Sequence, residues 1–219
     1  IFSALSVIPA FFIGRKISGN NVGGFYAALL VAISSFYVAR TTGESSDTDV
    51  FTVFFPLLIT WLFLEAYDSM RSRKWNYVLA TTTGLATCLF SLAWISGWWY
   101  IFLFLIIAVV GHVAIQSGVD LYHKRFSVSN LIRPLSILLA YVVSTGIFVT
   151  VVSSFENFWS AFFGPIGFMN IKNVAVTSLW PNIRTTVAEL NVPPFSSVVS
   201  ELGGNFLLVL AGMGIILSL

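Results

Sequence analysis

The residues best suited to chemistry lie in the polar segment from Arg40 to Asp49, between two apolar runs. The segment ends in Asp47-Thr48-Asp49, which places two carboxylates at positions i and i+2. If the backbone kinks, both can turn toward one hard cation, and Mg²⁺ and Mn²⁺ prefer such oxygen ligands. Arg40 is near enough to balance their charge. A lone Asp-x-Asp is more often part of a solvated loop. The elements around this one must therefore indicate whether it is functional.

The composition indicates a membrane protein. Of the 219 residues, 57% are hydrophobic and 9% charged, with a mean hydropathy of +0.90, which is outside the range of soluble domains. The net charge of +2 without a basic cluster excludes nucleic acid as a partner. The single cysteine, Cys88, excludes an internal disulfide or thiolate metal site. Because both ends lie in apolar runs, we expect an internal piece of a longer protein.

Seven apolar runs approach the length of about 20 residues that a membrane-spanning helix needs. They lack the two-residue alternation of barrel strands, so they predict helices. The expected architecture is an all-α, polytopic transmembrane bundle. Its helices are predicted at residues 1–14, 22–39, 51–66, 75–95, 98–115, 131–152 and 206–219, with a long outer connection over residues 153–205.

The distribution of Lys and Arg predicts the orientation. If the turn at Arg15-Lys16 is cytoplasmic, most of the eleven basic residues fall in inner connections. The exceptions are Arg40, Lys172 and Arg184. The acidic pair and the long connection then share the extracytoplasmic side of a multi-pass cell-membrane protein. Ionisable groups at a membrane edge are costly and are functional by default.

The long connection carries a third carboxylate, Glu189, in Thr186-Val187-Ala188-Glu189. Long loops in compact proteins are commonly functional, and lids often complete catalytic sites. We therefore expect this connection to bring Glu189 over Asp47 and Asp49. A surface carboxylate on a short helix or turn is the alternative.

These segments resemble motifs of the oligosaccharyltransferase catalytic subunits, the enzymes of asparagine-linked glycosylation. Arg40 to Asp49 is similar to their second acidic motif, and Thr186 to Glu189 is similar to Thr-Ile-x-Glu with Val in place of Ile. Trp94 to Trp99 and Glu201-Leu-Gly-Gly are less specific similarities. Order, spacing and a common side make the resemblance specific, and the Thr form of the loop motif favours an archaeal member.

The resemblance implies a GT-C type fold and a metal-dependent glycosyltransferase. The reaction it implies moves an oligosaccharide from a dolichyl phosphate or pyrophosphate carrier to the Asn amide of an Asn-x-Ser/Thr acceptor polypeptide. It also implies that Asp47 and Asp49 hold Mn²⁺ or Mg²⁺ and that Glu189, supported by Thr186, binds the acceptor amide. The resemblance further implies that Arg40 acts in catalysis, by orienting the carboxylates or contacting the carrier phosphate, and that Arg184 is a weaker candidate for binding phosphate. Membrane lipid is the remaining expected partner.

Two family elements are expected outside the chain, namely a first loop with its own acidic residue before Ile1 and a soluble domain after Leu219. We therefore expect the piece alone to be inactive. Trp98-Trp99-Tyr100 is superficially similar to the Trp-Trp-Asp-Tyr-Gly motif of that domain. Because Trp98-Trp99-Tyr100 opens a span and lacks the Asp and Gly, we interpret it as an aromatic anchor at the membrane interface.

Two alternatives remain open. One is another polyprenyl-phosphate-sugar glycosyltransferase, such as a mannosyltransferase, which would carry its acids in the first outer loop. The other is a transporter or cation channel with an acidic outer face. A channel or transporter predicts acids within the spans or inverted repeats with broken helices, and neither is apparent in the sequence.

Overall fold

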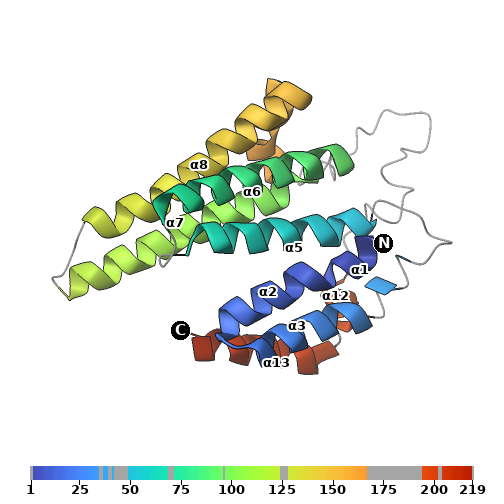
Figure 1. The fold of residues 1–219 in the computed structure, drawn as a ribbon. Coiled ribbons are helices and arrows are strands. Elements are labelled where there is room, and N and C mark those ends of the chain that lie inside the picture. The colour runs from blue at the N-terminus through green and yellow to red at the C-terminus, as the bar shows by residue number, and fades with distance from the viewer. Residues whose placement is uncertain are drawn as a thin grey trace, which may run out of the picture. The chain divides into compact units, whose positions relative to one another are not determined.

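The computed structural model describes residues 2–34, 37–38, 41, 49–68, 72–95, 97–123, 128–166, 194–201 and 204–218. Within these ranges every regular element is a helix (Figure 1). The chain divides into two compact units, Ile1–Ile166 and Gly167–Leu219.

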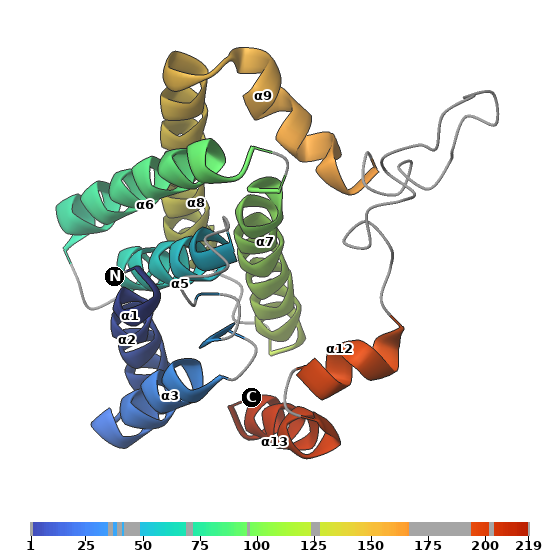
Figure 2. The same ribbon diagram turned by 90° about the vertical axis from the view of Figure 1, so that its right-hand side faces the viewer.

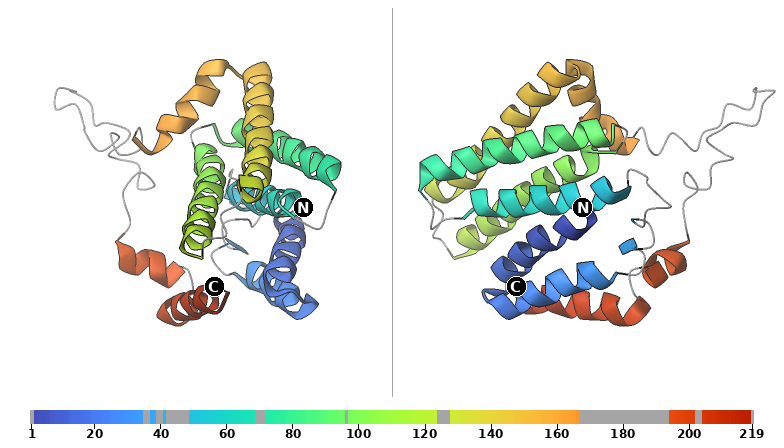
Figure 3. Two further views of the ribbon diagram at one scale, coloured as in Figure 1. Left: turned by 90° about the vertical axis from the view of Figure 1, so that its left-hand side faces the viewer. Right: turned by 45° about the vertical axis from the view of Figure 1, so that its right-hand side comes forward.

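The first unit opens with a helical hairpin, and Figure 3 shows its two longer helices side by side. Its helices are α1 (Phe2–Leu5), α2 (Val7–Ser18) and α3 (Asn21–Ile33). Gly19 ends α2 with a φ of 70°, a left-handed conformation that favours glycine. Asn20 then caps the start of α3, because its side-chain oxygen accepts the N–H of Gly23 at 2.9 Å. Gly14 lets the helices approach closely, since a Cβ there would lie 2.7 Å from the Gly23 carbonyl oxygen.

Four longer helices form the rest of the core of this unit. They are α5 (Asp49–Ala66), α6 (Arg73–Ala93), α7 (Trp99–Tyr122) and α8 (Val128–Val152). The core includes Ile59 of α5, Phe90 of α6 and Tyr141 of α8, all with 0% of their surface exposed. At Gly84, α6 meets α8 so closely that a Cβ would collide with the Ser144 side chain.

Hydroxyl groups bridge the same helices. The Thr87 and Tyr141 hydroxyl oxygens lie 3.1 Å apart, and both residues are fully buried. Small residues and interhelical hydroxyl contacts are how helices associate in lipid, where burial of apolar surface gives little driving force.

After α8 the chain turns sharply into α9 (Phe155–Ser160) and a short 3-10 helix, η1 (Ala161–Phe163), as Figure 2 shows. The Ser154 side chain caps α9 by accepting the N–H of Asn157 at 3.0 Å. The rings of Phe158 and Phe162 then pack on Phe102 of α7. The described part of the second unit is α12 (Phe195–Glu201) and α13 (Gly204–Ser218).

Among the described helices, α7 and the segment Leu131–Val152 of α8 are long and apolar enough to cross a membrane. Asn21–Ile33 and Val50–Ala66 are shorter apolar helices. The predicted span 98–115 corresponds to α7, which begins at Trp99 but continues to Tyr122. The predicted connection 153–205 contains α9, η1 and α12.

Candidate active site

Asp49 is the one predicted site residue whose backbone the structure describes, and it is the first residue of α5. A helix start carries unsatisfied N–H groups and partial positive charge, which favour an ionised carboxyl group. The other predicted site residues lie outside the described residues. They are Arg40, Asp47, Arg184, Thr186 and Glu189.

The first turn of α5 contains a carbonyl group that the helix itself does not bond. Pro56 lies inside α5 and has no N–H, so the Thr52 carbonyl, four residues earlier, lacks its usual helical donor. The Tyr100 hydroxyl, from the first turn of α7, donates to this carbonyl oxygen at 3.1 Å. The beginning of α7 therefore supports α5 three residues from Asp49.

An aromatic cluster holds the Tyr100 ring in place, and we define it as Phe55, Phe90, Trp94 and Tyr100. The Phe90 ring lies at its centre, 5.7 Å from Phe55 and 6.0 Å from Tyr100 between ring centroids. Trp94 lies 5.8 Å from Tyr100 in an edge-to-face arrangement. Such pairs are favourable because the positive edge of one ring meets the negative face of the other. The cluster ties the start of α5 to α6 and α7.

The tight turn before α7 corrects one sequence prediction. The Trp94 ring covers Gly97 so closely that a Cβ there would collide with it. The turn brings Trp98 into the bundle, where it is 1% exposed and packs on Phe102 at 5.6 Å. The interpretation of this residue as an interfacial anchor is therefore wrong, and Trp98 is a core residue.

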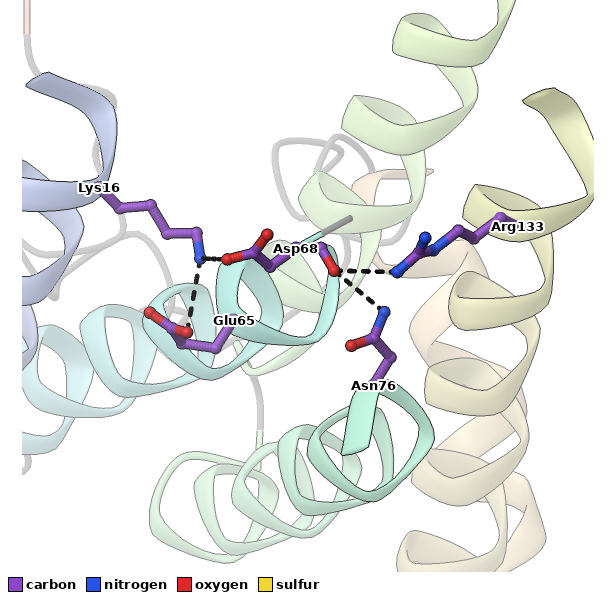
Figure 4. Close-up of polar contacts among 5 residues, drawn as sticks. All are labelled: Lys16, Glu65, Asp68, Asn76 and Arg133. Atoms are coloured by element: carbon purple, nitrogen blue, oxygen red, sulfur yellow. Dashed lines mark hydrogen bonds and ion pairs between the residues drawn. The ribbon is translucent and has the colours of Figure 1, made fainter. Parts of the chain in front are cut away.

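The opposite end of α5 carries a network that we call the charged cluster, made of Lys16, Glu65, Asp68, Asn76 and Arg133 (Figure 4). Lys16 Nζ lies 2.8 Å from Asp68 Oδ2 and 3.4 Å from Glu65 Oε2. The backbone carbonyl oxygen of Asp68 accepts hydrogen bonds from Asn76 Nδ2 and Arg133 Nη2, each at 3.1 Å. The cluster joins α2, α6 and α8 to the end of α5.

Sequence reasoning used the charges of this cluster only as markers of topology and missed their pairing. The available signal was Lys16 near the end of one apolar run and two acids at the end of another, on the same predicted side. Because Lys16 pairs with both carboxylates, we interpret the cluster as structural. With a rise of 1.5 Å per residue, it lies about 24 Å along α5 from Asp49.

In the described ranges, no group of three or more His, Cys, Asp or Glu side chains is placed to hold a metal ion. The predicted ligands Asp47 and Asp49 supply carboxylate oxygens, and this donor type fits Mg²⁺ or Mn²⁺. The donor chemistry therefore agrees with a hard divalent cation at the start of α5.

The described elements are all helices and two of them are long and apolar enough to cross a membrane, as predicted for an all-α membrane protein; the match to a family model makes it one of the polytopic GT-C type. The chain belongs to the STT3 family. The family model described as "Oligosaccharyl transferase STT3, N-terminal" matches residues 1–219, which is the whole chain. The resemblance found from the two motifs is thereby confirmed.

The chain is also similar in sequence to two archaeal proteins. The chain is 27% identical over 238 residues to the dolichyl-phosphooligosaccharide-protein glycotransferase of Methanococcus voltae. It is 22% identical over 293 residues to the protein of the same name from Methanocaldococcus jannaschii. Each alignment covers 100% of this chain but only 26% and 31% of the relatives, so the chain spans between a quarter and a third of their length. No solved structure gives a significant match.

Proposed function

We propose that the protein transfers an oligosaccharide from a dolichyl phosphate or pyrophosphate carrier to the Asn side chain of an Asn-x-Ser/Thr acceptor. The observation that carries this proposal is the match of the STT3 N-terminal family model to every residue of the chain. The placement of Asp49 as the first residue of a helix agrees with it.

The acceptor presents the first chemical problem. An amide nitrogen is a poor nucleophile because its lone pair is delocalised into the carbonyl group. Glu189 accepts hydrogen bonds from the acceptor N–H groups and holds the nitrogen with its lone pair toward the sugar. Orientation of this kind supplies much of the rate of a reaction between two bound substrates. Thr186 supports the turn that carries Glu189.

The leaving group presents the second problem. As the bond between the sugar and the carrier phosphate breaks, negative charge grows on the phosphate oxygens. Arg40 contacts those oxygens through its guanidinium fork, and Arg184 is a further phosphate ligand. Asp47 and Asp49 would hold the divalent cation, which when bound supplies Lewis-acid stabilisation of the same charge.

The proposed active face is extracytoplasmic, in a multi-pass chain. The Lys and Arg bias of the sequence supports this assignment. A division of labour between two sides is supported by the positions of Asp49 and the charged cluster at opposite ends of α5. Membrane lipid surrounds the bundle, consistent with exposed apolar side chains such as Phe104 and Ile107 on α7.

The test is glycopeptide formation by the full-length protein in membranes supplied with lipid-linked oligosaccharide and an Asn-x-Thr peptide. We expect product with Mn²⁺, loss of product with chelator, and loss in Asp49→Ala. Glu156→Ala is the matched control, since Glu156 is an exposed carboxylate in the first turn of α9, and it should retain transfer. A correctly inserted protein that forms no product under any of these conditions contradicts the proposal and favours a sugar-lipid transferase with a different acceptor.

A further inference from the structure

The first turn of α5 receives a hydrogen bond from another helix. Pro56 has no N–H with which to bond the Thr52 carbonyl within the helix, and the Tyr100 hydroxyl donates to that carbonyl oxygen at 3.1 Å. A neutral hydroxyl can satisfy a carbonyl without adding charge to the site. In most helices such a carbonyl accepts from an N–H of the same helix, whereas here the hydrogen bond joins two helices.

The position of this bond matters because helix ends fray most readily. Thr52 belongs to the same turn as Asp49, so a displacement of its peptide group moves the residues before it. The Tyr100 ring is itself held by Phe90, which is fully buried, and by Trp94. The support for the first turn of α5 therefore comes from the packed core.

We propose that Tyr100 is a positioning residue for Asp49. Its hydroxyl holds the first turn of α5, and through it the backbone of Asp49, in the geometry that binds the divalent cation. This inference rests on the proposed function, and it adds a residue that makes no contact with substrate or metal.

The test measures binding of Mn²⁺ to the full-length protein in detergent, from the loss of the free-ion signal in electron paramagnetic resonance. Tyr100→Phe keeps the ring and removes only the hydroxyl group. Partners bonded directly to metal ligands are worth about tenfold or more in affinity. Because Tyr100 bonds the backbone three residues from Asp49 and not Asp49 itself, we expect Tyr100→Phe to raise the Kd for Mn²⁺ less, roughly three- to tenfold. The amides of residues 49–54 should also exchange their hydrogens faster than in the wild type.

A rescue variant distinguishes positioning from general damage. Pro56→Ala restores an N–H that can bond the Thr52 carbonyl within α5. In the double variant Tyr100→Phe/Pro56→Ala, both the Kd and the local exchange should return to within about twofold of the Pro56→Ala values, because the Tyr100 hydroxyl is no longer needed. Tyr122→Phe is the matched control, since this tyrosine is 85% exposed at the other end of α7 and should leave both readings unchanged.

Two outcomes overturn the proposal. The first is an unchanged Kd in Tyr100→Phe, and faster exchange alongside it would give the hydroxyl a structural role alone. The second is weaker binding that Pro56→Ala does not restore. Asp49→Asn separates the two levels of inference, because unchanged Mn²⁺ binding there removes the metal site of the proposed function and the role of Tyr100 with it. Lost binding in Asp49→Asn together with normal binding in Tyr100→Phe rejects only the positioning role.

Discussion

The two ends of α5 are held by different kinds of interaction. At the end of the helix, Lys16 pairs with Glu65 and Asp68, and two side chains donate to the Asp68 carbonyl oxygen. At the beginning, a tyrosine hydroxyl and the aromatic cluster provide the support. Opposite charges within about 4 Å stabilise one another and so reduce the capacity of a carboxylate to bind a metal ion. Neutral support at the start of α5 would avoid this loss at the proposed metal site.

A tyrosine lies near each end and sharpens the contrast. Tyr100 donates its hydroxyl to a backbone carbonyl oxygen. Tyr67, which directly follows α5, has a buried hydroxyl without a hydrogen-bond partner, and its ring packs edge-to-face on His112 at 5.8 Å. Tyrosine therefore contributes a hydrogen bond at the beginning of α5, through Tyr100, and mainly apolar contact at its end, through Tyr67.

The largest expected effect comes from removing one charge at each end of α5. Asp49→Asn should reduce oligosaccharide transfer about 100-fold or more, because the proposed metal ligand is lost, while leaving the melting temperature nearly unchanged. Asp68→Asn should lower the melting temperature and leave transfer per folded molecule unchanged. Transfer assays and thermal unfolding of the same preparations check both. A loss of transfer in Asp68→Asn without loss of stability would contradict the division between the two ends.

The second prediction concerns the buried amide of the charged cluster. Asn76 is 1% exposed and donates to the Asp68 carbonyl oxygen. Asn76→Ala removes this bond and leaves a cavity, so it should lower the free energy of unfolding by about 1–3 kcal/mol. Denaturant unfolding measures the loss. Asn21→Ala, at an exposed position that begins α3, should change stability much less, and an equal loss in both variants would remove the special role of the cluster.

A smaller effect is expected from the cation of the cluster. Lys16→Met removes the partner of Glu65 and Asp68. Because the Lys16 and Asp68 side chains are 26% and 30% exposed, solvent screens the pair, and the loss should be about 1 kcal/mol or less. Unfolding at low and high salt checks this estimate, because high salt should reduce the difference in stability between the wild type and Lys16→Met. Lys74→Met, at an exposed site in α6, serves as the control and should show no comparable salt-dependent difference.

The smallest expected effect is at Tyr67. Tyr67→Phe removes a hydroxyl without a partner, so it should be neutral or stabilising by up to about 1 kcal/mol. Burial raises the pKa of Tyr67 above its ordinary value. The unfolded chain therefore releases this proton at lower pH than the folded protein does, and stability falls as the pH rises above about 10.

Unfolding measured between neutral and alkaline pH tests this predicted loss of stability. Tyr67→Phe should reduce the alkaline loss of stability relative to the wild type. Tyr100→Phe, by contrast, removes a formed bond and should be destabilising at neutral pH. If both variants destabilise equally at neutral pH, the two tyrosines do not differ in the way described.

Hydrophobicity located the main helices well because long apolar runs leave little choice of structure in lipid. The predicted span 51–66 falls within Asp49–Ala66, and the predicted span 75–95 lies within two residues of Arg73–Ala93 at each end. The end of α7 was harder, because Gln116 to Tyr122 are mostly polar or small yet continue the helix. Apolar runs mark the part of a helix inside the membrane but do not limit the helix to it.

Contacts between helices were not predictable in the same way. Pro56 shows from sequence alone that one carbonyl loses its helical donor, but only the packing of α7 on α5 identifies Tyr100 as the replacement. Burial of Trp98 likewise depends on a tight turn. The motifs named the candidate site residues through resemblance, whereas their mutual geometry involves residues 167–193, outside the described ranges.

The bond between Tyr100 and Thr52 also has a consequence for biogenesis. Chains are made from the N-terminus at about 5–20 residues per second, so α5 leaves the ribosome before α7. Its first turn can be completed only after the later helix has docked beside it. Hydrogen bonding at the start of α5 is therefore completed late in assembly, and the metal affinity proposed for Asp49 should appear in the nascent protein only after α7 has docked.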